Sequence, residues 1–159
     1  AGGIAEAETL LEAGDTAAAA QILTALVQAE PENLDARVLL AGALAWTQPQ
    51  RALDLGEGVG ADARHYDVAQ AVRTAARLLA LELAALPADP ARADYLAALE
   101  ALRSGDFDTA ARHLIAAVEA NRSYDEDGPR LACIALFKLL GRGHGVTQDY
   151  RRRFNMALH

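Results

Sequence analysis

Apolar side chains recur every three or four residues along most of the chain, the spacing that places them on one face of an α-helix. The longest such pattern predicts a helix over 63–86, with Asp62 as its N-cap. Shorter patterns predict a helix over 33–46 and another that begins at Pro49. The sequence contains no credible strand pattern, so we predict an all-α chain of about nine helices.

Two segments repeat one order of residues, and each has a turn between two predicted helices. Glycine at the turn accepts the positive φ that often ends a helix, and the aspartate after it can cap the next helix. A small alanine then lets the two helices approach closely, and a leucine one turn later fills the space between them. The matched positions are Gly14 and Gly105, Asp15 and Asp106, Ala19 and Ala110, and Leu23 and Leu114.

This order of residues, followed in the first copy by a stop at Pro31, resembles the tetratricopeptide repeat, a helix-turn-helix unit of about 34 residues. An alanine-rich helix pair of another kind could share the Gly-Asp turn, but two copies in register favour the repeat. The resemblance implies tetratricopeptide-like helix-hairpin repeats that form an α-α superhelix in a single domain over 1–159. The clear repeats are near 1–31 and 91–122, a degenerate repeat is near 33–57, and the final helices are near 129–140 and 147–158.

The composition supports a helical interior and argues against several kinds of partner. Hydrophobic residues make up 52% of the chain and aromatic residues only 5%, so most of the apolar mass is alanine and leucine, which favour helices. The 15 basic and 22 acidic residues give a net charge of −7, which repels nucleic acid and anionic membranes. No segment approaches the roughly 18 apolar residues that a membrane span needs. We therefore expect no nucleic-acid partner and no membrane partner.

Residues that could carry chemistry are present, but their spacing does not predict an active site. The histidines His65, His113, His144 and His159 form no pair at i, i+4, and no carboxylate stands at metal-ligand spacing. Cys133, the single cysteine, lies among apolar residues of a predicted helix, where we expect a buried, inert thiol. We expect no metal, no cofactor and no enzymatic activity. An enzyme with carboxylates inside the superhelix is the alternative, and it predicts a deep polar pocket with shifted pKa values.

Two runs of unusual composition are interpreted as parts of helix connections. Residues 141–145 contain three glycines but lack the Lys-Ser/Thr ending of a phosphate loop, so we predict a flexible connector. The acidic run 125–127 lacks the spacing of a calcium loop. It precedes a helix predicted to open at Gly128-Pro129, where the helix dipole favours negative charge.

The last predicted helix, 147–158, carries the strongest candidate binding site. Its apolar residues fall at four-residue steps and form one narrow stripe, while three successive arginines occupy the other faces. Aromatic and arginine residues are the types that dominate interface hot spots, although a solvated basic face is an equally simple interpretation. The stripe suits either a docked or a projecting helix. The candidate partner-binding residues are Tyr150, Arg151, Arg152, Arg153, Phe154 and Leu158.

The order of features over residues 89–158 is similar to the C-terminal part of the bacterial thioredoxin-fused co-chaperones, the YbbN-type proteins or chaperedoxins. The residues that carry the resemblance are Asp89-Pro90-Ala91-Arg92, Tyr95 to Leu99, Gly105 to Ala110, Asp127 to Leu131, Leu136 to Gly141 and Tyr150 to Phe154.

The resemblance implies a cytoplasmic protein that holds unfolding clients and docks to the chaperonin GroEL through its last helix. It also implies a thioredoxin-like domain before this one, and the opening Ala1-Gly2-Gly3, without an initiating Met, agrees with a piece of a longer chain. Any redox role would belong to that other domain. The alternative is a tetratricopeptide scaffold or adaptor for one defined complex.

The lysine and asparagine with which many tetratricopeptide grooves clamp a peptide's C-terminal carboxylate are absent. Ile4 and Glu8 stand at the corresponding positions of the first repeat, and Tyr95 and Leu99 in the second. The resemblance therefore disfavours such a clamp, and an apolar, alanine-rich groove suits exposed hydrophobic segments better.

Overall fold

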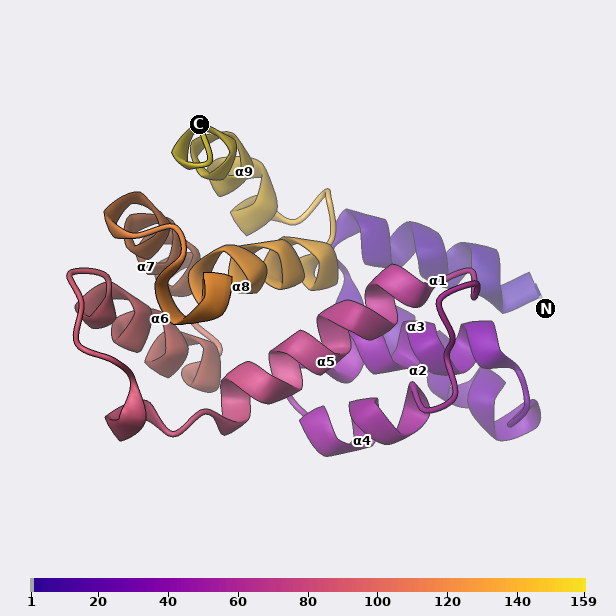
Figure 1. The fold of residues 1–159 in the computed structure, drawn as a ribbon. Helices are drawn as coiled ribbons and strands as arrows, with labels where there is room; N and C mark the ends of the chain where they lie inside the picture. The colour runs from indigo at the N-terminus through magenta and orange to yellow at the C-terminus, as the bar shows by residue number, and fades with distance from the viewer. Residues whose placement is uncertain (1) are drawn as a thin grey trace.

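The computed structural model describes residues 2–159, and this part of the chain folds into nine α-helices and one short 3-10 helix, without strands (Figure 1). Ala1, the first residue of the Ala1-Gly2-Gly3 opening, lies outside the described residues. The all-α prediction is confirmed. The helices are α1 (Gly2–Ala13), α2 (Thr16–Ala29), α3 (Leu34–Leu44), α4 (Pro49–Leu55), α5 (Tyr66–Ala80), α6 (Arg92–Ser104), α7 (Phe107–Ala120), α8 (Tyr124–Leu140) and α9 (Gly145–Ala157), with the 3-10 helix at Leu83–Ala85.

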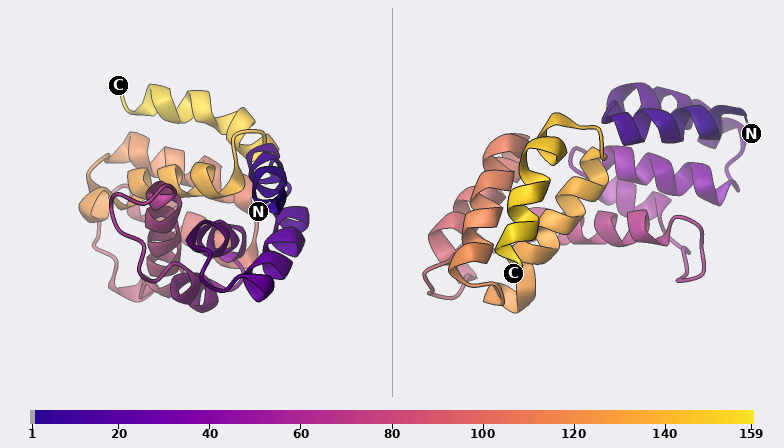
Figure 2. Two further views of the ribbon diagram at one scale, coloured as in Figure 1. Left: turned by 90° about the vertical axis from the view of Figure 1, so that its right-hand side faces the viewer. Right: turned by 90° about the horizontal axis from the view of Figure 1, so that it is seen from above.

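Helices that follow one another along the chain pack as pairs, and the pairs curl around a common interior (Figures 1 and 2). The pairs are α1 with α2, α3 with α4, and α6 with α7. Helix α5 leads from the first half to the second and packs along α8, while α9 packs on α7 and α8. The curl brings the loop before α9 against the end of α1, where the backbone N–H of Gly143 donates a 2.6 Å hydrogen bond to the carbonyl of Glu12.

The two matched turns have the geometry that the sequence predicts. Gly14 and Gly105 have φ values of 89° and 78°, in the left-handed region that glycine tolerates. The carboxylate of Asp15 accepts a 3.1 Å hydrogen bond from the N–H of Ala18, and Asp106 accepts one of 3.2 Å from Thr109. The small and large apolar residues predicted between the helices are fully buried: Ala19, Leu23, Ala110 and Leu114.

The N-cap of α7 makes a pH-dependent contribution to stability. The pKa of Asp106 lies below its ordinary value because the hydroxyl and the backbone N–H of Thr109 donate hydrogen bonds to its carboxylate. A lowered pKa in the folded state adds stability above the unfolded-state pKa, and this contribution is lost as the pH falls through the folded-state value. We expect the difference in Tm between the natural chain and Asp106→Asn to be constant above about pH 5 and to shrink below about pH 4.

Circular dichroism over a pH series measures this difference. Asparagine also caps helices well but does not titrate, so the substitution removes the charge and keeps the cap. A difference in Tm that is the same at pH 3 and pH 7, within error, would show that the charge of Asp106 contributes nothing.

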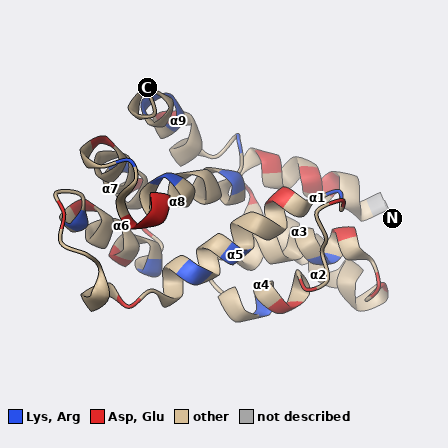
Figure 3. Ribbon diagram, in the orientation of Figure 1, with Lys and Arg blue, Asp and Glu red and all other residues tan. Residues whose placement is uncertain are grey.

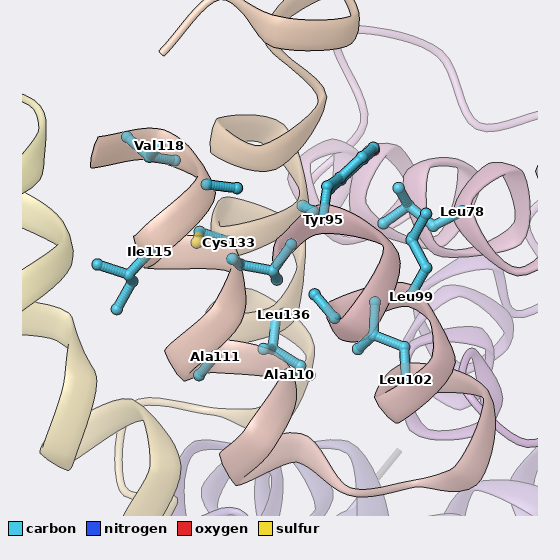
Figure 4. Packing of buried hydrophobic residues seen from close by; sticks show 14 of the residues in the cluster. Leu78, Tyr95, Leu99, Leu102, Ala110, Ala111, Ile115, Val118, Cys133 and Leu136 are labelled. Carbon is cyan, nitrogen blue, oxygen red and sulfur yellow. The ribbon is translucent and has the colours of Figure 1, made fainter. Parts of the chain in front are cut away.

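The larger core lies between α6, α7 and α8 (Figure 4). Tyr95 and Leu99 of α6, Ile115 of α7 and Leu136 of α8 are almost completely buried there. Cys133 lies among them, and burial raises the pKa of its thiol far above the ordinary value. The prediction of a buried cysteine is confirmed, and a thiol that stays protonated is a poor nucleophile.

The helix predicted over 63–86 is shorter in the structure. Helix α5 ends at Ala80, because Leu81 is extended, with φ −59° and ψ 138°. The guanidinium of Arg103 donates a 2.6 Å hydrogen bond to the carbonyl of Leu81, and Leu86 turns into the core beside α6. The residue before a proline disfavours the helical conformation, and Leu86, before Pro87, is extended. The prediction of one continuous helix was therefore wrong at its end.

The predicted start of this helix also differs. Asp62 makes no cap to α5, since the residue at the N-cap position is His65, which makes no side-chain cap hydrogen bond. The backbone of residues 60–65 forms turns instead. A three-residue shift in a turn-rich segment changes which residue precedes the first helical amide, and apolar spacing does not specify such a shift.

The acidic run in the first turn of α8 has left-handed backbone geometry. Asp125, Glu126 and Asp127 have φ values of 50°, 55° and 64°, so the right-handed part of α8 begins after them, as the Gly128-Pro129 pair predicts. Three successive non-glycine residues seldom adopt this conformation, because Cβ approaches the following carbonyl oxygen. The Arg130 guanidinium lies 3.3 Å from the Asp127 carboxylate and partly neutralises the run.

Candidate functional site

A cavity of about 430 Å³ lies where α1, α3, α5, α8 and α9 come together. It is partly open, and it brings together helices from both ends of the chain. Its apolar lining comes from all five helices and includes Ile134 of α8, whose side chain is 46% exposed. The apolar lining residues include Leu11, Leu39, Val68, Ile134, Phe137 and Leu139. We call this feature the groove.

The helices that line the groove carry opposite charges, acidic on α1 and basic on α9 and the end of α8 (Figure 3). Helix α1 contributes Glu8 and Glu12, and the facing wall contributes Lys138 of α8, Arg151 of α9 and Arg142 of the loop between them.

Ion pairs neutralise only part of this charge. Glu8 pairs with Arg64 at 3.3 Å, and Lys138 pairs with Asp67 at 2.5 Å. The Lys138 ammonium is among the groups that lower the pKa of Asp67 against the opposing effect of burial. Within residues 2–159, Arg142 and Arg151 have no carboxylate partner. The α8 and α9 side of the groove therefore holds unneutralised positive charge in an acidic protein.

Two buried polar atoms in the lining lack a hydrogen-bond partner among the described residues. One is the hydroxyl oxygen of Thr147, whose side chain is 2% exposed, and the other is Nε2 of His65. A buried polar group without a partner costs about 1–3 kcal/mol. Because both residues line a cavity, a bound molecule could supply the missing hydrogen bonds.

Helix α9 is docked on the body and does not project. Phe154 is only 5% exposed, and its ring meets that of Phe137 edge-on with centroids 5.8 Å apart. Tyr150 and Leu158 are half-buried beside it. Burial and a hydrogen bond with Asp108 raise the pKa of Tyr150. The apolar stripe is thus used inside the domain, and Phe154 offers little surface to a partner.

The three arginines of α9 differ in their surroundings. Arg151 lines the groove, Arg152 is exposed outside it, and Arg153 pairs with Glu119 at 3.2 Å. The six candidate residues are therefore not one site. Two of the arginines, Arg151 and Arg152, keep free charge, and they belong to different surfaces.

Sequence reasoning missed a second stripe on α9. Thr147, Arg151 and Asn155 stand at four-residue steps and all line the groove. Their spacing was visible beside the apolar stripe. Polar residues on a helix usually face solvent, so only the neighbouring helices reveal that this face borders a cavity.

The glycine run 141–145 leads from α8 into α9, as the sequence predicts, and two of its glycines pack against the end of α1. Gly141 has a φ of 97°, and a Cβ built there would lie close to the carbonyl oxygen of Leu11. A Cβ on Gly143 would lie 2.9 Å from the carbonyl oxygen of Glu12. These glycines serve a close approach of two backbones, which residues nearby in sequence do not indicate.

The histidines do not form a common site. His113 meets Asp94 at 2.9 Å, and Nδ1 of His144 accepts a hydrogen bond from the N–H of Val146. No three His, Cys, Asp or Glu side chains in the described part of the chain are grouped as metal ligands would be. None of the described helices has the length and apolar character to cross a membrane.

Paired helices that curl around an open groove define a helical-repeat protein of the kind that binds other proteins. Comparison with family models agrees, since a tetratricopeptide repeat model matches residues 68–159 and another matches residues 10–49. The first covers more than half of the chain, which therefore belongs to the tetratricopeptide repeat family and is a protein–protein interaction module. No curated protein and no solved structure matches the chain.

Proposed function

We propose that this domain binds segments of non-native client proteins in its groove, as part of a thioredoxin-linked co-chaperone of the bacterial cytoplasm. The groove is the observation that carries the proposal. Its lining includes the half-exposed side chain of Ile134 of α8. Exposed apolar side chains in a concave surface suit the apolar segments that an unfolding protein exposes.

The resemblance to the thioredoxin-fused co-chaperones supports the finer part of the proposal. The residues that carry it lie on α6, α7, α8 and α9 and in the connections next to them. We propose that GroEL docks on the outer face of α9, where Arg152 is exposed and has no ion pair among the described residues. Truncating the chain before α9 would test this poorly, because it would also remove Phe154 from the core.

Light scattering from heat-unfolded citrate synthase tests client binding. We expect the domain to reduce the scattering, and we expect Ile134→Glu to weaken this effect several-fold, since it places a charge in the apolar part of the groove. Met156→Glu is the matched control, because Met156 is 68% exposed and does not line the groove. A natural chain that leaves aggregation unchanged would refute client binding.

Biolayer interferometry on immobilised GroEL tests the chaperonin contact. Arg152→Glu should weaken binding about tenfold if the side chain makes a charge-assisted contact. Arg51→Glu, at an exposed position of α4, makes the same charge change far from α9 in sequence and should have no effect.

An adaptor for one defined complex is the other function that membership of the family allows. It predicts one stable partner and no affinity for GroEL. A natural chain that is folded by circular dichroism but does not bind GroEL would favour the adaptor.

A further inference from the structure

We propose that the start of α9 forms a carboxylate subsite within the groove, so that the bound segment carries an acidic side chain next to a bulky apolar one. This inference rests on the proposed function, since it specifies what the groove accepts. The subsite consists of Thr147 and Arg151 of α9 and Arg142 of the loop before it, all of which line the groove.

The hydroxyl of Thr147 is the most specific indication of a ligand. The side chain is 2% exposed, and its oxygen has no partner within residues 2–159. Thr147 lies in the first turn of α9, where the helix dipole is positive and backbone N–H groups lack partners within the helix. Nδ1 of His144 accepts a hydrogen bond from the N–H of Val146 and so satisfies one of these backbone groups. A carboxylate can accept hydrogen bonds at such a helix start, whereas a cation is disfavoured.

The charges around Thr147 agree with an anionic ligand. Arg151 lies one turn after Thr147, and neither Arg151 nor Arg142 has an ion pair in the described chain. Their basic neighbours Lys138 and Arg153 are both paired with carboxylates of the domain. Within the groove, the unpaired positive charge thus lies on the side where the unpartnered hydroxyl lies.

The acidic residues of α1 determine on which side of the groove the acidic side chain of the segment binds. Glu8 and Glu12 of α1 would repel an acidic side chain, so we place that side chain on the α9 wall. Ile134 and Phe137 of α8 line the same groove and offer an apolar surface to the neighbouring side chain. The subsite residues are not at the positions with which tetratricopeptide grooves clamp a C-terminal carboxylate. The ligand that we propose is instead the carboxylate of a side chain.

A library of random decapeptides displayed on phage tests the specificity. The natural chain and Arg51→Gln should both select peptides with Asp or Glu beside Leu, Ile, Val or Phe, and Arg151→Gln should lose the acidic preference. The two variants remove the same charge from exposed arginines, but only Arg151 lines the groove. Circular dichroism should show equal helix content in all three chains.

A selected peptide, synthesised with an amidated C-terminus, tests the contact itself. Changing its Asp or Glu to the amide should weaken binding about tenfold, the effect of losing one charge-assisted hydrogen bond. Arg151→Gln should weaken the original peptide similarly and leave the amide variant unaffected. The backbone amide signals of Thr147 and Arg151 should shift in NMR spectra when the peptide binds.

Several results would overturn the subsite. An acidic preference that survives in Arg151→Gln, selected peptides without acidic residues, or binding that requires a free C-terminal carboxylate would each contradict it. If the natural chain selects no peptide, the subsite is refuted as well. The light-scattering assay with citrate synthase then decides separately whether the domain binds clients, so failure of the subsite and failure of the proposed function are distinguishable.

Discussion

Replacing Gly141 with alanine is expected to lower the free energy of unfolding by about 3 kcal/mol. Two effects add at this position. Gly141 has a φ of 97°, which L-residues rarely adopt, and the new Cβ would collide with the carbonyl oxygen of Leu11. That oxygen belongs to the backbone of α1, so the collision can be relieved only by moving α1 or the loop before α9. Urea denaturation followed by circular dichroism measures the effect.

Two other glycines separate the collision from the backbone strain. Gly105 has a φ of 78° with no atom within 4 Å of a built Cβ, so Gly105→Ala should cost only about 1 kcal/mol. Gly145 begins α9 with open space around it, and Gly145→Ala should have little effect or stabilise slightly. Equal losses at Gly141 and Gly105 would contradict a close contact between the loop and α1.

Phe154→Ala is expected to destabilise the domain by about 3 kcal/mol. Phe154 is 5% exposed, and its ring packs edge-on against Phe137 in the largest buried cluster. Truncation removes buried apolar surface and the contact that holds α9 on α8. The value is at the lower end for a buried phenylalanine because the neighbouring groove lets the site relax. Thermal unfolding gives the loss of stability, and hydrogen exchange should show the largest loss of protection in α9.

Met156→Ala is the control for this prediction. Met156 lies two residues later on α9 but is 68% exposed, so its truncation should change the stability by less than about 0.5 kcal/mol. If Phe154→Ala were equally mild, α9 would be projecting in solution and its aromatic residues would again be free to bind a partner. A large effect at Phe154 would leave Arg151 and Arg152 as the residues of α9 with free charge.

Both predictions bear on the groove, because Gly141 and Phe154 line it and their contacts with α1 and α8 position α9. A shift of α9 would move Thr147 and Arg151 away from the facing wall of α1. We therefore expect variants at Gly141 and Phe154 to lose client binding together with stability, whereas Arg151→Gln should affect binding alone.

The sequence alone determined the helical fold and the main hairpin turns. Gly14 and Gly105, the caps at Asp15 and Asp106, and the buried residues between the helices all act over one or two turns of chain. Such local preferences are readable because each residue's conformation depends mainly on its neighbours in sequence. The burial of the Cys133 thiol was predictable for the same reason, since apolar residues precede and follow it in its helix.

Only the tertiary structure decided the end of α5, the packing of the glycine run and the position of the groove. Leu81 leaves the helix so that Leu86 can reach a core built by α6 and later helices. The carbonyl of Leu11 leaves no room for a side chain at Gly141. Thr147 and Arg151 line a groove to which α1, α3 and α5 also contribute. These contacts join residues far apart in the chain, and they depend on how much the helix pairs curl. The spacing of apolar residues specifies which face of a helix is buried, but it does not specify where the two ends of the curl meet.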